Sequence, residues 1–133
     1  MIEPDIELNA AVARDVMRWT ALGSHLWQDR QTSTVYYTGH DPKRVFIPHT
    51  VFNPSSDALH AAWVEEQIWR LRKREAYFDA LIQEVGLDEH NVTVAYTTGY
   101  PAPDRAPVVQ QVLLQATPVQ RCRAALQVVR DAG

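Results

Sequence analysis

The chain has 133 residues, of which 46% are hydrophobic and 22% charged, a size and composition typical of one globular domain. No apolar run approaches the roughly 20 residues that span a bilayer, and the acidic start lacks the basic and apolar parts of a signal peptide. The net charge of −3 argues against a protein that coats nucleic acid, because such proteins need clustered basic residues. The sequence therefore predicts a single domain over residues 1–133, cytoplasmic and without a membrane partner.

An amphipathic helix is expected over residues 5–19. Asp5 is suited to cap the free N–H groups of its first turn. Apolar residues recur at helical spacing behind it and form one stripe: Leu8, Val12, Val16 and Trp19. The segment 21–24, Ala-Leu-Gly-Ser, ends the helix.

A β-hairpin is expected next. Residues 35–38 are β-branched and aromatic, as in a strand, and residues 39–42 supply turn-forming types. Residues 45–47, Val-Phe-Ile, then read as the returning strand, which Pro48 stops or places at a sheet edge.

The central segment predicts a long helix. Asp57 is a suitable N-cap, and Gly86 stands where the residue after a helix C-terminus would. Unbroken, the roughly 29 residues between them would measure about 43 Å, which is long for a domain of this size, so we expect a kink or break near residues 73–76. Its apolar face comprises Ala61, Val64, Ile68, Leu71, Phe78, Ile82 and Val85.

The last third predicts two strands and a helix. Strands are expected at residues 91–97 and 108–114, on either side of a proline-rich loop at 99–107. Thr117 and Pro118 then open a helix that carries Cys122, Leu126 and Val129 on one face. The order α-β-β-α-β-β-α predicts an α+β fold: a three-layer α/β/α sandwich around a small, mainly antiparallel sheet. The first and last helices would pack on that sheet.

Three segments resemble the phage ABA sandwich domain, a family of small phage and prophage proteins. They are residues 8–19, which end in Met-Arg-Trp, residues 52–57 with 61–63, and residues 116–118 with 122–126. The segment 65–89 departs from the family as a longer charged insertion. The resemblance implies an α/β/α sandwich and a phage protein acting in the cytoplasm of an infected bacterium. It implies no established biochemical activity.

The residues that carry chemistry form no recognisable catalytic or metal site. The five histidines, at positions 25, 40, 49, 60 and 90, lack the spacing of zinc ligands. Cys122 lies on the apolar face of its helix, which favours burial over nucleophilic reactivity. No glycine-rich phosphate loop or nucleophile elbow is present. The sequence thus predicts a protein that is not an enzyme and that holds neither metal nor cofactor.

The central helix carries the candidate binding surface. Tryptophan, tyrosine and arginine concentrate binding energy at interfaces, and Trp63 and Trp69 cannot share the face of Val64 and Ile68. A solvated helix face, packing against the loop at 96–107 and a homodimer contact are the alternatives. The predicted partner-binding residues are Trp63, Trp69, Arg70, Arg72, Arg74 and Tyr77.

Two functions follow from these features. The first is a non-catalytic factor that binds a host bacterial protein, for example an inhibitor of a defence system of the anti-CRISPR type. The second is an accessory protein that binds a small ligand or nucleic acid, motivated by the arginines and the loop at 96–107. Nucleic acid is the less favoured partner because the net charge is negative.

Overall fold

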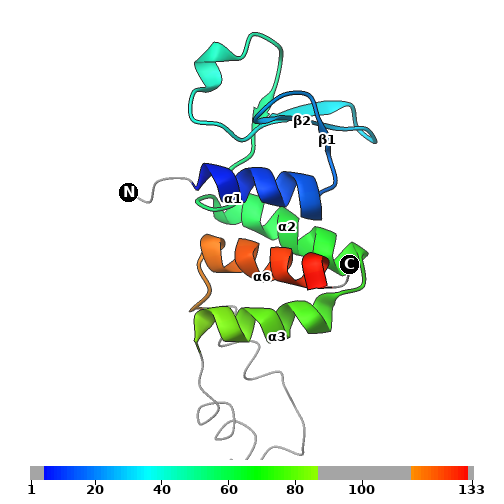
Figure 1. Ribbon diagram of the computed structural model, residues 1–133, viewed down its shortest axis with the longest axis vertical. Coiled ribbons are helices and arrows are strands. Elements are labelled where there is room, and N and C mark those ends of the chain that lie inside the picture. Colours follow the sequence, from blue (N-terminus) through cyan, green and yellow to red (C-terminus); the bar gives the residue numbers. More distant parts are fainter. Residues whose placement is uncertain (1–4, 87–114, 132–133) are drawn as a thin grey trace, which may run out of the picture.

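The computed structural model describes residues 5–86 and 115–131. The predicted strands at 91–97 and 108–114 and the proline-rich loop between them lie outside the described residues. Within those residues the protein is α+β, with four α-helices and a four-stranded mixed sheet. Figure 1 shows the helices stacked in the order α1, α2, α6 and α3, with the sheet beyond α1.

The first helix ends earlier than its apolar stripe predicts. Helix α1 (Ile6–Ala11) continues into a π-helical turn, η1 (Val12–Val16), and the Asp5 carboxylate accepts the N–H of Leu8 as predicted. Arg18 then adopts a left-handed backbone with φ of 58°. This turn directs Trp19 away from the helix, so its placement on the helical stripe was wrong.

The sheet lies at one end of the helical stack. Its strands run in the order β1 (Thr20–Ala21), β2 (Leu26–Asp29), β3 (Thr34–Tyr37) and β4 (Thr50–Val51). The first two pairings are antiparallel and the last, β3 with β4, is parallel. In the β2–β3 hairpin, Trp27 stands opposite Tyr36.

The predicted hairpin had the correct first strand and the wrong partner. Residues 35–37 lie in β3, but residues 45–47 form no strand, and Phe46 is 95% exposed. The partner is β2, because Trp27 buries its ring there and donates its indole N–H to Thr38 Oγ1 at 3.0 Å. A short 3₁₀ helix, η2 (Pro42–Arg44), lies between the predicted turn and the predicted returning strand, overlapping the turn only at Pro42.

The central helix is broken into α2 (Ala58–Arg70) and α3 (Arg74–Val85). The break is a Schellman motif with Arg72 in the left-handed region, at φ of 59°. Its two backbone bonds are present: Lys73 donates to Ile68 at 3.2 Å, and Arg72 donates to Trp69 at 3.0 Å. The predicted caps are confirmed, since Asp57 accepts two N–H groups and Gly86 has φ of 80°.

The last helix, α6 (Pro118–Asp131), completes the core. Thr117 Oγ1 accepts the N–H of Gln120 while the Gln120 side chain accepts the N–H of Thr117, a reciprocal capping box. Helix α6 lies between α2 and α3 and also contacts α1 and η1. Cys122 and Leu126 are buried as predicted, but α6 packs chiefly on the other helices, so among the described residues its predicted packing on the sheet was wrong. The three-layer order stays a prediction, because two of its strands lie outside the described residues.

Candidate functional site

A cleft of about 570 Å³ lies where the end of the first helical segment, the β2–β3 hairpin and α2 meet. Its volume falls in the range of small-molecule sites. The lining residues come from three separate parts of the sequence. They are Met17, Arg18, Trp19, Asp29, Arg30, Gln31, Tyr36, Trp63, Glu66, Gln67 and Arg70.

Three aromatic rings line this cleft. Trp19 stacks on Tyr36 with ring centroids 4.0 Å apart and planes inclined by 3°. The buried Phe52 contacts Trp19 edge-on, at 4.8 Å between centroids, and so fixes the stack to the core. Trp63 lines the α2 side. Burial, with the nearby charge of Asp29, raises the pKa of the Tyr36 phenol, which therefore stays neutral at physiological pH.

Three arginines line the same cleft, and two of them lack a carboxylate partner. Across residues 5–86 and 115–131, no carboxylate lies within ion-pair distance of Arg18 or Arg30, and both side chains are exposed. Arg70 instead donates to Glu66 at 2.8 Å. The cleft is therefore lined by two exposed arginines that no carboxylate of the described residues neutralises.

The backbone beside the cleft is unusual. The π-helical turn η1 immediately precedes it, and Arg18 lies in the left-handed region that non-glycine residues rarely occupy. π-Helical turns occur often at functional sites, and backbone strain collects where a fold positions a side chain for a task. Here the two features together place Arg18 at the cleft and bring Trp19 onto Tyr36.

The predicted binding residues separate into two groups. Trp63 and Arg70 line the cleft. Trp69 and Arg74 lie at the α2–α3 corner, where the Arg74 guanidinium is 5.6 Å from the centroid of the Trp69 ring. Arg72 is exposed at the break between these helices. The binding roles of these five residues stay predictions.

Tyr77 was wrongly placed on the exposed surface, because the structure buries it completely. Its hydroxyl donates to Glu65 Oε2 at 2.6 Å, and Arg121 Nη1 donates to both oxygens of that carboxylate at 2.8 and 2.9 Å. The break between α2 and α3 explains the error, since it turns Tyr77 back toward α2 and α6. Sequence spacing along one continuous helix could not reveal this.

Cys122 belongs to the same buried region. It is fully buried, and burial together with the charge of Glu65 raises the pKa of its thiol to about 12. The thiolate is the nucleophilic form of cysteine. Cys122 is therefore a packing residue, as its helical position predicts.

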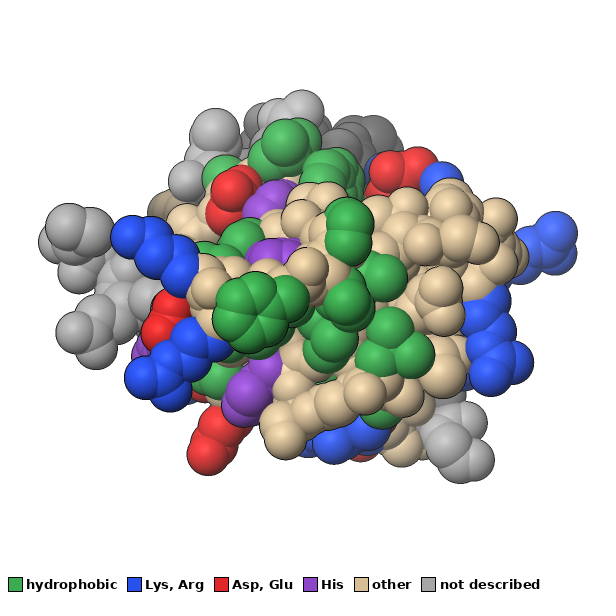
Figure 2. Space-filling view, turned by 90° about the horizontal axis from the view of Figure 1, so that it is seen from above, with side chains coloured by type: hydrophobic (Ala, Val, Ile, Leu, Met, Phe, Trp, Pro, Cys, Tyr) green, Lys and Arg blue, Asp and Glu red, His purple; other side chains and the backbone are tan. Residues whose placement is uncertain are grey.

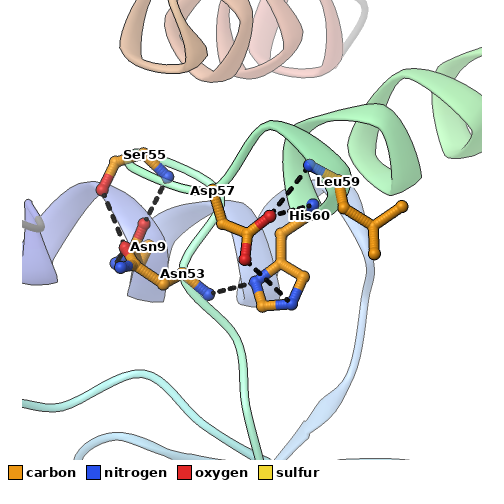
Figure 3. Close-up of polar contacts among 6 residues, drawn as sticks. All are labelled: Asn9, Asn53, Ser55, Asp57, Leu59 and His60. Carbon is orange, nitrogen blue, oxygen red and sulfur yellow. Dashed lines mark hydrogen bonds and ion pairs between the residues drawn. The ribbon is translucent and has the colours of Figure 1, made fainter.

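A polar network joins α1 to the loop before α2 (Figure 3). The side chains of Asn9 and Asn53 are hydrogen-bonded at 2.9 Å, and Asn9 Oδ1 accepts the N–H of Ser55 at 3.0 Å. The N–H of Asn53 donates to Nδ1 of His60 at 2.9 Å, and burial lowers the pKa of His60. The network holds the loop at the start of α2, with Asp57 as its cap.

Exposed hydrophobic side chains mark a second surface. Figure 2 shows hydrophobic side chains gathered on the end of the molecule that carries the sheet. Among residues 5–86 and 115–131, Phe46 is the most exposed large hydrophobic residue, and Ile47 follows it in the same loop. The other exposed large hydrophobic residues of this described part are Leu22, Val51 and Leu59.

In the described part of the chain, no three histidine, cysteine, aspartate or glutamate side chains gather closely enough to hold a metal ion. In the same residues, no helix combines the length and apolar character needed to cross a membrane.

Comparisons of this chain with protein families, with curated proteins and with solved structures found no match. The resemblance to the phage ABA sandwich family therefore stays a prediction. Of the cleft residues, sequence reasoning named Trp63 and Arg70 but missed Arg18, Arg30 and the Trp19–Tyr36 stack. No sequence signal joins these residues, because only the β2–β3 hairpin and the turn at Arg18 bring them together.

Proposed function

We propose that this chain is a non-catalytic binding protein that holds an anionic ligand in the arginine cleft. The observation that carries the proposal is the pair of arginines, Arg18 and Arg30, exposed in a cleft without carboxylate partners among the described residues. Guanidinium groups bind phosphate and carboxylate groups with paired, charge-assisted hydrogen bonds.

Three residues with catalytic potential, Cys122, His60 and Glu65, support a binding role, because each is used in a structural contact away from the cleft. Cys122 is buried with a raised pKa. His60 accepts a backbone N–H through Nδ1 and packs against Phe52 and Trp63. Glu65 is held by Arg121 and Tyr77. Cys122, His60 and Glu65 all lie outside the cleft lining.

The test measures the binding of pyrophosphate to the full chain by calorimetry. The parent should bind, and Arg18→Glu or Arg30→Glu should weaken binding by about tenfold or more, because a charge-assisted hydrogen bond contributes about 1.5–3 kcal/mol. Arg123→Glu is the matched control, since it makes the same charge change at an exposed position of α6 outside the cleft. Equal weakening in all three variants would show only a general charge effect and would contradict the proposal.

A second candidate function is the binding of a host bacterial protein, including inhibition of a defence system. Phe46, an aromatic ring that is 95% exposed beside the exposed Ile47, favours it, because aromatic anchors dominate protein interfaces. The phage setting and the three-layer fold rest on the resemblance of three segments to the phage ABA sandwich family.

This candidate is tested by a pull-down from a bacterial lysate with mass spectrometry. A stoichiometric host protein that is captured by the parent and by Leu59→Ser, but lost with Phe46→Ser, would support it. Leu59 is the control because it is also an exposed hydrophobic residue, on the first turn of α2. Equal capture by Phe46→Ser and the parent would exclude the Phe46 loop as the contact.

A further inference from the structure

We propose that the ligand of the cleft is a nucleoside phosphate, a molecule that joins a phosphate group to a planar base through a hydroxyl-bearing sugar. This inference rests on the proposed function, because it names the ligand class of the same cleft. It follows from three kinds of lining residue, each of which matches a different part of such a molecule.

The phosphate is matched by Arg18 and Arg30. Arg18 and Arg30 line the cleft and are exposed, and no described carboxylate neutralises them. Their planar donors suit the bidentate geometry of phosphate oxygens. The left-handed backbone at Arg18 holds that residue at the cleft between Met17 and Trp19.

The planar base is matched by the aromatic lining. Trp63 lines the cleft from α2, Trp19 lines it from the end of the first helical segment, and Tyr36 lines it from β3. Base stacking on aromatic side chains contributes about 1–3 kcal/mol per base and tolerates any base, since every base has a π face. The contact between Trp19 and the buried Phe52 keeps this lining rigid, so little side-chain entropy is lost on binding.

The acidic and amide side chains of the cleft distinguish this ligand from a simple anion. Asp29, Glu66, Gln31 and Gln67 line the cleft together with the arginines. Glu66 is already paired with Arg70, so Asp29 is the carboxylate that a bare polyanion would meet without any donor to offer it. A nucleoside phosphate brings sugar hydroxyl and base N–H donors that these oxygens can accept. The mixed lining therefore fits a ligand that is anionic at one end and rich in donors at the other.

The test compares AMP with its two parts, adenosine and inorganic phosphate, by calorimetry on the full chain. We expect AMP to bind about tenfold or more tightly than either part, because the two contacts act within one molecule. Arg30→Glu should weaken AMP binding and leave adenosine binding unchanged. Trp63→Leu should weaken the binding of AMP and of adenosine while sparing phosphate. Arg123→Glu is again the charge control, and melting curves confirm that each variant is folded.

The outcomes separate this inference from the proposed function. If phosphate binds as tightly as AMP and its binding depends on Arg18 and Arg30, the cleft is a site for simple anions. The inference of a nucleoside phosphate ligand would then be wrong, while the proposed function would stand. If neither AMP nor phosphate binds, both proposals fail. AMP binding that is unchanged in Arg30→Glu would also overturn the inference. A short single-stranded DNA is also titrated as a source of the same chemical groups: if it binds more tightly than AMP, and Arg30→Glu and Trp63→Leu abolish its binding, the result would support the inferred recognition of phosphate and base. The natural ligand would then be a nucleic acid strand instead of a free nucleotide.

Discussion

The indole ring of Trp19 lies flat on the ring of Tyr36, with centroids 4.0 Å apart. One ring follows the first helical segment and the other lies in the centre of the β2–β3 hairpin. The stack therefore joins the helical part of the molecule to the sheet and forms part of the cleft lining. Its energy can be measured separately from ligand binding.

Replacing either ring of this stack should destabilise the fold. We expect Trp19→Leu and Tyr36→Leu each to lower the free energy of unfolding by about 1–2 kcal/mol, through lost apolar burial. The double variant should reveal a coupling energy of about 0.5–1.5 kcal/mol, typical of aromatic pairs. Urea denaturation of the parent, the two single variants and the double variant gives this double-mutant cycle. Additive losses would mean that the two rings do not stack in solution.

A charge at Val16 should unfold the protein. Val16 is fully buried in η1, where helix α6 packs, and an unpaired charge in such a place costs several kcal/mol. Circular dichroism of Val16→Asp should show lost helix at room temperature. Ala62→Asp, at an exposed position of α2, is the control and should remain folded. A Val16→Asp variant that melts like the parent would contradict the packing of the first helix.

The break between α2 and α3 predicts opposite effects of two substitutions at Arg72. Glycine adopts the left-handed region freely, so Arg72→Gly should raise the free energy of unfolding by about 0.5–1 kcal/mol. Arg72→Val should lower it by about 1–2 kcal/mol, because β-branched residues are outliers there. Denaturant midpoints measure both. The opposite order would indicate one continuous helix.

Protonation of His60 should lower the free energy of unfolding in acid. Burial lowers its pKa in the folded protein below the unfolded value of 6.5, so the neutral ring stabilises the fold above pH 6.5, and this contribution is lost as the pH falls through the folded pKa. Protonation of Nδ1 also removes the acceptor of the Asn53 N–H. His60→Asn offers an uncharged acceptor, so its stability should fall less than that of the parent between pH 7 and pH 5. Identical falls in urea titrations would exclude His60 as the cause.

Local features of the fold were predictable from sequence, and features set by distant contacts were not. The caps at Asp5, Asp57 and Thr117 were confirmed because a cap is a contact between near neighbours. The break expected near residues 73–76 is present between Arg70 and Arg74, but its left-handed residue could not be placed from sequence, because it is an arginine, Arg72, and not a glycine. Strand β2 was missed because its pairing depends on burial of Trp27 against the helices.

The residues of the cleft were also only partly predictable from sequence. Arg70 and Trp63 were named because they stand near each other on one helix, and Tyr77 was named with them although the chain turns before it. Arg18 and Arg30 come from a helix end and a hairpin turn, twelve positions apart, and no periodic pattern relates such positions. Only the tertiary structure places them in one site.

The central claim, that an anionic ligand occupies the arginine cleft, is tested most directly by the indole N–H signals of the four tryptophans in an NMR titration with pyrophosphate. Trp19 and Trp63 line the cleft, whereas Trp27 is buried against Thr38 and Trp69 lies at the α2–α3 corner. We predict saturable shifts of the Trp19 and Trp63 signals, with those of Trp27 and Trp69 unchanged. Shifts confined to Trp69, or an absence of shifts in all four signals, would contradict the claim.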